Sequence, residues 1–250
     1  MECAKAVIFD YIGTLVNCRG YTMEASKENL YMALAAEGFN VSKSNFLQAY
    51  DLAHEKYRII RFEQLREITN AVWVAEALNN LGYEVGADDY RIKCALNVFF
   101  KAYVETFELR DGAIKLLKRA REHSKVGLIS NFTHAPVIHK SLRLLGINTF
   151  FSVVAVSNEV GWRKPSPKIF EDALNRLGIK ANEAVYIGDS PIEDIKGGKE
   201  AGLKTIFVPS QFNSLNDLAK SQQRPDFIKE DLESILGSLS EIMRLTNLKS

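Results

Sequence analysis

The sequence has few cysteines, no long apolar run and no clear targeting segment. Its three cysteines, Cys3, Cys18 and Cys94, form no CxxC pair and stand near no histidine cluster, which argues against a disulfide framework and a zinc site. No apolar run reaches the roughly 20 residues of a membrane helix, and the N-terminus lacks the layout of a signal peptide. We therefore expect a cytoplasmic protein with reduced thiols.

The sequence also lacks an excess of either charge. Its 250 residues include 32 basic and 31 acidic side chains, so no global field attracts nucleic acid or a membrane surface. We expect a small-molecule ligand instead, and the sequence is equally compatible with a monomer and a homodimer. With 46% hydrophobic residues the chain can bury a substantial core, as one large domain or two modest ones.

Short apolar runs alternate with helical patterns over most of the chain. Runs that are apolar throughout are typical of parallel strands covered on both faces. The alternation predicts an α/β fold, a Rossmann-like, doubly wound parallel sheet that binds ligands at the carboxyl ends of its strands. The strand candidates are residues 6–9, 126–129, 184–187 and 205–208, with 150–156 as a fifth, and the helix candidates between them are 113–123, 135–147, 167–179 and 194–202.

Residues from about 20 to 105 break this rhythm, because they carry only amphipathic helical patterns. We predict a smaller all-helical domain at residues 19–105, over the mouth of a sheet domain formed by residues 1–18 and 106–250. The polar stretch 210–226 is predicted to be a surface loop with a short helical turn before the closing helix.

Chemically capable side chains follow the first two strand candidates. Asp10 comes directly after the first, ahead of Gly13, which permits a tight turn. Taken alone, it is equally well explained as a turn aspartate. Ser130 and Asn131 come at the equivalent end of the second, where hydroxyl and N–H groups can hold the oxygens of an anion.

Two further stretches add a lysine and two carboxylates. Lys164 stands in GWRKPSPKIF, where prolines stiffen the loop, and Asp189 and Asp194 stand in YIGDSPIEDIKGGKEAG after a strand candidate. Asp194 is also explained as a helix N-cap. With Asp10, the three carboxylates would repel one another unless a hard cation lies among them, and Mg²⁺ is the natural occupant.

The ordered stretches FDYIGTL, LISN, RKPSPKIF and YIGDSPIEDIKGGKEAG resemble the four signatures of the haloacid dehalogenase-like hydrolase superfamily, over nearly the whole chain. The resemblance implies a Rossmann-like core with a helical cap and catalysis through an aspartyl intermediate. It also implies specific roles. Asp10 would be the nucleophile, Ser130, Asn131 and Lys164 would bind the phosphoryl group, and Mg²⁺ would bind Asp10, the backbone carbonyl of Ile12, Asp189 and Asp194.

Ile12 departs from the phosphatase pattern of that family. Phosphatases of the family have an aspartate there, which protonates the leaving alkoxide and then activates water, and isoleucine can do neither. Loss of a general acid–base typically costs a factor of about 10² to 10⁴ in rate. A Mg²⁺-dependent phosphatase with weakened acid–base catalysis is the first interpretation, acting on esters whose leaving group needs little protonation or supplies its own.

Three alternatives stay open. A metal-independent 2-haloacid dehalogenase would release halide without a proton, although Tyr11 is one place too early for the family's dehalogenase tyrosine and GDSPIED is the phosphatase form. A phosphonatase would need a Schiff-base lysine in the cap, for which the candidates are Lys27, Lys43 and Lys56. A non-catalytic descendant would only bind a phosphorylated ligand or a partner protein.

Substrate choice is expected to lie with the helical domain. Tyr57, Arg58, Arg61 and Arg66 could face the site, and Arg66 is our predicted substrate-binding residue. Trp73, Phe99, Phe100 and Tyr103 are predicted to be core side chains rather than a ligand cage. Among the histidines, His134 is the candidate substitute for the missing acid–base, since it follows Asn131 closely.

Overall fold

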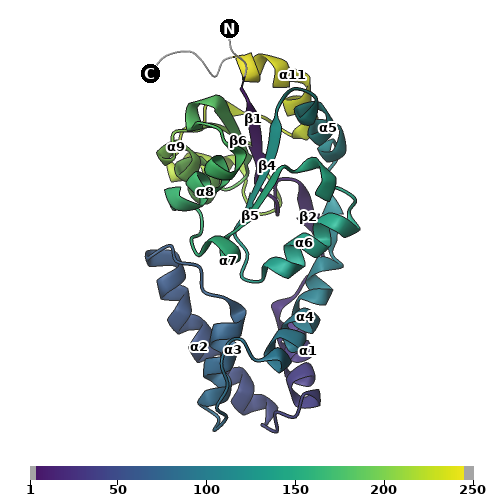
Figure 1. Cartoon of the computed structure of the whole chain (residues 1–250), viewed down its shortest axis with the longest axis vertical. Coiled ribbons are helices and arrows are strands. Elements are labelled where there is room, and N and C mark those ends of the chain that lie inside the picture. Colours follow the sequence, from purple (N-terminus) through teal and green to yellow (C-terminus); the bar gives the residue numbers. More distant parts are fainter. Residues whose placement is uncertain (1–3, 245–250) are drawn as a thin grey trace.

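A six-stranded parallel sheet forms the centre of the molecule (Figure 1). The structure is a computed structural model that describes residues 4–244. Each pair of neighbouring strands is parallel and β1 lies in the middle, so the predicted doubly wound α/β fold is confirmed. In spatial order the strands are β5 (Val153–Val156), β4 (Lys125–Ser130), β1 (Ala6–Phe9), β6 (Ala184–Gly188), β7 (Lys204–Phe207) and β8 (Phe227–Ile228).

The observed strands follow the predicted runs closely, with two differences. The fifth candidate is shorter than predicted, because residues 148–150 form a 3₁₀ turn, η1 (Asn148–Phe150), before β5 begins. The edge strand β8 was not predicted, since two residues are too few to give an apolar run.

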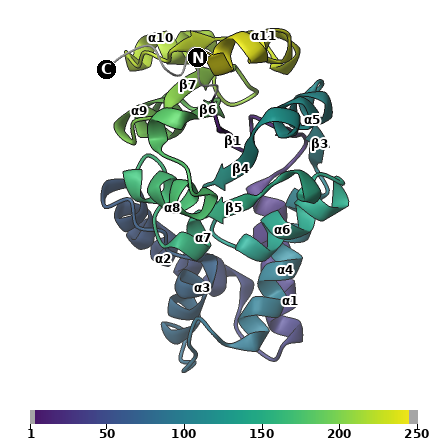
Figure 2. The same ribbon diagram turned by 45° about the horizontal axis from the view of Figure 1, so that its top comes forward.

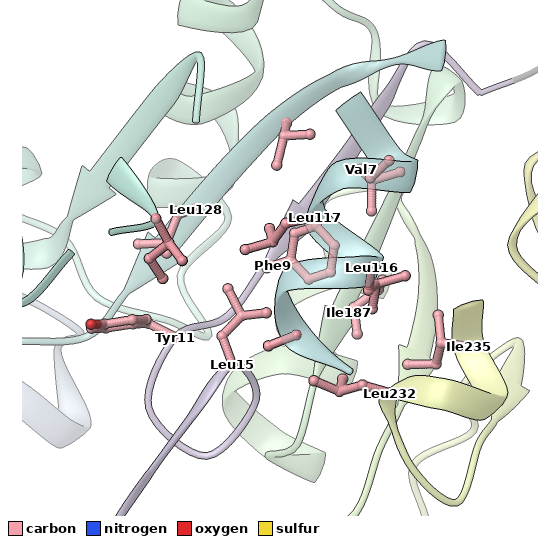
Figure 3. Close-up of a cluster of buried hydrophobic side chains, with 14 of the residues drawn as sticks. Val7, Phe9, Tyr11, Leu15, Leu116, Leu117, Leu128, Ile187, Leu232 and Ile235 are labelled. Atoms are coloured by element: carbon pink, nitrogen blue, oxygen red, sulfur yellow. The ribbon is translucent and has the colours of Figure 1, made fainter. Parts of the chain in front are cut away.

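Helices cover both faces of the sheet (Figure 2). Alternate residues of β1 face opposite sides, so Val7 and Phe9 pack in one apolar cluster while Ala6 and Ile8 pack in another. Figure 3 shows part of the first cluster, in which Phe9 lies beside Leu116 and Leu117. That face is covered by α5 (Ala113–His123), α6 (Ala135–Leu144) and α11 (Leu232–Arg244), and the other by α8 (Pro167–Leu177) and α9 (Gly197–Glu200).

Four helices form a block at the opposite end of the molecule from α11 (Figure 1). They enclose an apolar cluster largely of their own, with α1 packed on α4 and α2 on α3. We propose that this helical block is a separate domain at residues 19–105. Its helices are α1 (Met23–Ala36), α2 (Lys43–Glu63), α3 (Asn70–Asn79) and α4 (Tyr90–Val104).

Two connections join the helical block to the sheet domain. The first is a short antiparallel pair, β2 (Val16–Cys18) and β3 (Phe107–Leu109), which lies at the proposed boundaries. The second is the segment 64–69 between α2 and α3, where the backbone N–H of Glu67 donates to Gly161 and that of Arg163 donates to Leu65. The sequence predicted neither connection, since three-residue strands and a break within a helical pattern give weak signals.

The remaining short elements complete the connections of the sheet domain. In residues 4–244, no helix combines the length and the apolar character that a membrane crossing requires. Cys18 and Cys94 are free thiols, while Cys3 lies outside the described residues. The short elements are α7 (Ser157–Val160), η2 (Ala181–Glu183), η3 (Pro191–Lys196) and α10 (Leu215–Ser221), the last of which is the predicted helical turn of the 210–226 stretch.

Candidate active site

Three carboxylates meet at the carboxyl edge of the sheet. Asp10 follows β1 and Asp189 follows the neighbouring strand β6, so the parallel pairing brings them together. Asp194 lies in η3, five residues after Asp189. All three are buried, and one oxygen of each lies within 4.8 Å of the others.

Lys164 lies among these carboxylates. Its Nζ donates to Oδ1 of Asp10 and to Oδ1 of Asp194, both at 2.6 Å, and to the hydroxyl of Tyr186 at 3.0 Å. The side chain of Asn131 holds the lysine's backbone, since its Oδ1 accepts from the Lys164 N–H at 2.7 Å and its Nδ2 donates to the Lys164 carbonyl at 3.0 Å. Asn131, predicted to bind phosphate, therefore uses both side-chain groups to position the lysine.

The electrostatics of the cluster favour a cation. Burial raises the pKa of Asp10 well above its ordinary value, and Asp194 and Asp189 add to this although Lys164 opposes it. Burial acts to lower the pKa of Lys164, but the charges of Asp10 and Asp194 outweigh it and raise that pKa. Oδ2 of Asp10 is buried without a hydrogen-bond partner among residues 4–244. One lysine thus balances only part of the negative charge, and the donor set fits a hard divalent cation.

Two glycines let the carboxylates approach so closely. Gly13 has φ +101°, and a Cβ there would lie 2.6 Å from Oδ2 of Asp189. A Cβ on Gly188 would lie 2.4 Å from that of Asp194. Both positions therefore require glycine.

The helix predicted at 194–202 differs from the observed structure. Residues 191–196 form the π-helical turn η3, and the cap is Ser190, whose Oγ accepts from the Glu193 N–H. Asp194 is therefore not an N-cap. Its Oδ2 instead accepts from the backbone N–H groups of Asp189 and Ser190, at 3.1 and 2.8 Å. This turn aims the carboxylate at the cluster, as π-turns often do at functional sites.

Asp189 is held by residues that the sequence did not single out. Ser210 Oγ and Asn213 Nδ2 donate to its Oδ2 at 2.5 and 3.0 Å. Both belong to the 210–226 stretch predicted to be a surface loop. The signal that could have found them is their position just after β7, at the same edge of the sheet.

A cavity of about 510 Å³ opens between this cluster and the helical block. Ile12 lines it and packs partly against the apolar core, so no proton donor stands at that position. Ser130 is buried at the end of β4 and is not among the lining residues. The sheet domain contributes Asp10, Ile12, Asn131, Phe132, Thr133, Asp189, Ser190, Glu193, Asp194, Phe212 and Asn213, and the helical block contributes Tyr21, Met23, Tyr50, His54, Arg61, Asn70, Trp73, Phe99, Phe100 and Tyr103.

Arg61 is the predicted arginine that reaches the cavity, and Arg66 does not line it. Arg66 belongs to the 64–69 connection, and its guanidinium lies 4.4 Å from the ring centroid of Trp162. Arg58 pairs with Glu55 on the surface, and the hydroxyl of Tyr57 donates to Glu76. The helical pattern could not locate the break that turns Arg66 away from the cavity.

The predicted aromatic core residues do pack in the helical block, as expected, but they also face the cavity. Trp73 and Phe99 are almost fully buried. His134 does not line the cavity, because it stacks on Phe100 at 5.3 Å. The histidine that lines it is His54, which no sequence pattern singled out.

Comparison with known proteins settles the family. A sequence model described as "haloacid dehalogenase-like hydrolase" matches residues 4–202. The chain belongs to the haloacid dehalogenase-like hydrolases. This hydrolase is 31% identical to the glyceraldehyde 3-phosphate phosphatase of Methanopyrus kandleri over 248 residues, covering 96% of this chain and 99% of the relative. It is 42% identical to the protein of the same name from Methanocaldococcus jannaschii over 217 residues, covering 82% and 84%.

Solved structures share the fold of the hydrolase. A 2-haloacid dehalogenase from Pseudomonas syringae pv. Tomato superposes with a TM-score of 0.67 at 21% identity, covering 96% of this chain and 98% of that one. A haloacid dehalogenase-type phosphatase from Thermococcus onnurineus gives a TM-score of 0.54 at 22% identity, covering 95% and 97%. At such identities these likenesses support the fold alone.

Proposed function

We propose that this hydrolase is a cytoplasmic, Mg²⁺-dependent phosphatase that acts on a small phosphorylated metabolite through an aspartyl-phosphate intermediate. The observation that carries the proposal is the buried cluster of Asp10, Asp189 and Asp194 around Lys164, at the mouth of a cavity of about 510 Å³. The names of the relatives support it, since both are called phosphatases of glyceraldehyde 3-phosphate.

In this proposal, residues of the chain position the reacting groups and offset the charge that develops on them. Asp10 attacks phosphorus and becomes the aspartyl phosphate as the alcohol of the substrate leaves, and water then hydrolyses this acyl phosphate, which releases phosphate and restores the carboxylate of Asp10. Lys164 holds the nucleophile through its 2.6 Å contact and offsets charge on the transferring group. Asn131 fixes the loop that carries the lysine.

The same residues supply the ligands that Mg²⁺ prefers. We propose that Asp10, the backbone carbonyl of Ile12, Asp189 and Asp194 hold the ion, since the three carboxylates converge and Oδ2 of Asp10 has no hydrogen-bond partner in the described part of the chain. When bound, Mg²⁺ neutralises negative charge on the phosphoryl oxygens.

Ile12 deprives the proposed phosphatase of a general acid–base at this position. Because no carboxyl group stands at that position, the leaving group must depart with little protonation or with a proton of its own. We expect simple alkyl phosphates to be hydrolysed about 10² to 10⁴ times more slowly than they would be with a general acid present.

The other interpretations have less support. A metal-independent dehalogenase does not require three converging carboxylates, which suit a cation. The lysines considered for a phosphonatase are each paired with an acidic side chain, and none lines the cavity. They are Lys27 with Asp51, Lys43 with Glu28 and Lys56 with Glu76.

A panel of substrates tests the proposal. Phosphorylated metabolites, acyl phosphates and 2-chloropropionate are each assayed with and without Mg²⁺, on the wild type and on Asp10→Asn. We expect phosphate release that depends on Mg²⁺ and is lost in Asp10→Asn. Chloride release without metal would overturn the proposal in favour of a dehalogenase, and ligand binding without turnover would favour a non-catalytic protein.

A further inference from the structure

The wall of the cavity that faces away from the carboxylate cluster carries one cation. Arg61 is the only arginine or lysine among the described residues that line the cavity. Its Nε donates to Oε1 of Glu67 at 2.7 Å, and the side chain of Glu67 is fully buried. The charge of Arg61 is therefore already balanced by a carboxylate that water does not reach.

The sheet domain holds this ion pair in place. Oε2 of Glu67 accepts a hydrogen bond from the hydroxyl of Ser157 at 2.6 Å, and the backbone N–H of Glu67 donates to Gly161. Separating Arg61 from Glu67 would leave a buried carboxylate without a counter-charge, which is strongly unfavourable. The pair therefore stays formed and is neutral overall, so a substrate carboxylate that accepts from the remaining N–H groups of Arg61 meets no net positive charge.

Other groups that face this end of the cavity are negative or neutral. Glu193 lines the cavity, and its carboxylate accepts from Arg163, so the charge of that arginine is also balanced. Burial and the charge of Arg61 lower the pKa of His54, which favours its neutral ring. Asn70 is buried, and its Oδ1 has no hydrogen-bond partner among residues 4–244.

We propose, resting on the phosphatase function above, that this enzyme selects phosphate monoesters whose leaving group is uncharged and carries a hydroxyl group. A hydroxyl can donate to Oδ1 of Asn70, which satisfies a buried acceptor. A carboxylate at the same end loses hydration and, among the described lining residues, gains no cation whose charge is not already balanced, because Arg61 is paired with Glu67. The Arg61–Glu67 pair is thus a specificity element against carboxylated esters.

A matched pair of substrates tests this selectivity. Glyceraldehyde 3-phosphate and 3-phosphoglycerate differ only in an aldehyde against a carboxylate at one carbon. We expect kcat/KM to favour the aldehyde by at least about tenfold. Equal values, or a preference for the carboxylate, would overturn the inference. Release of nitrophenol from p-nitrophenyl phosphate reports the phosphatase activity separately, so loss of selectivity and loss of the proposed function give different results.

Two variants of the ion pair should change the preference between the esters in opposite directions. Glu67→Gln leaves the charge of Arg61 unbalanced, so we expect the preference for the aldehyde to fall by about tenfold or more. Arg61→Gln leaves Glu67 unpaired, and the preference should widen; this variant also decides the question if Glu67→Gln does not fold. Glu55→Gln is the control, because Glu55 pairs with Arg58 on the exposed face of the same helix. A ratio that stays constant in both cavity variants would refute the role of the pair.

Binding measurements decide the case in which neither ester is turned over. Calorimetric titration of Asp10→Asn with the two esters in the presence of Mg²⁺ should give tighter binding of glyceraldehyde 3-phosphate. Equal binding of the two would overturn the selectivity, whatever the outcome of the activity assays.

Discussion

Ile12→Asp would place a carboxyl group beside Asp10, at the position where the family's phosphatases have their general acid. Ile12 already lines the cavity, so the new group can reach the leaving oxygen without rearrangement of the chain. General acid–base catalysis contributes about 10² to 10⁴ in rate, equivalent to about 2.7 to 5.5 kcal/mol of activation free energy. Two costs oppose this gain.

The first cost is electrostatic, because a fourth carboxylate joins Asp10, Asp189 and Asp194. Repulsion raises the pKa of the added group, which helps it to act as an acid but reduces its use as a base. The second cost is in packing, since Ile12 is half-buried against the apolar core. Replacing it loses roughly 1 to 2 kcal/mol of the free energy of unfolding. We therefore expect the gain on an alkyl ester to lie near the lower limit, about 10²-fold.

The assay compares an alkyl ester, glycerol 3-phosphate, with p-nitrophenyl phosphate at saturating Mg²⁺. A nitrophenolate leaves readily without a proton, so its kcat should rise far less than that of the alkyl ester. Ile12→Asn is the control, because it matches aspartate in size and cannot transfer a proton. An equal gain with both esters, or the same gain in Ile12→Asn, would show that proton transfer is not what Ile12 removes.

Three further predictions concern stability and geometry. Lys164→Met leaves buried carboxylates without their cation and should lower the free energy of unfolding by about 3 to 5 kcal/mol, measured in urea, with partial recovery on addition of Mg²⁺. Recovery by NaCl alone would contradict the role of a divalent cation. Burial lowers the pKa of His54 and His134, so below about pH 6.5 the unfolded chain binds protons that the folded chain does not. The free energy of unfolding should therefore decrease as the pH is lowered through this range. The double variant His54→Gln/His134→Gln should flatten that fall, and an unchanged slope of urea midpoint against pH would refute this cause. Gly13→Ala should abolish phosphate release, since its Cβ would overlap a site carboxylate, whereas Gly146→Ala, at φ +68° with open space around it, should lose about 1 kcal/mol of stability and keep its activity.

The sequence by itself determined the sheet and the end of it that carries the chemistry. Fully apolar strands must be buried on both faces, and parallel strands place their carboxyl ends at one edge. Asp10 and Asp189 therefore lie close together, because β1 and β6 are neighbouring strands. Lys164, which contacts Asp10, lies on a loop that prolines stiffen. These inferences needed only local patterns and the order of the strands.

Only the tertiary structure decided which polar groups face the substrate. Helical periodicity identifies an apolar stripe, but it does not say how a helix is rotated over a cavity or where a long pattern breaks. The break at 64–69 turned Arg66 onto Trp162 and buried Glu67 against Arg61 and Ser157, which lies 90 residues further along the chain. Contacts over such separations depend on how the helical block packs against the rest of the chain, and no local pattern encodes them. The proposed nucleophile and cation site follow from strand ends, whereas the proposed choice of leaving group follows from packing.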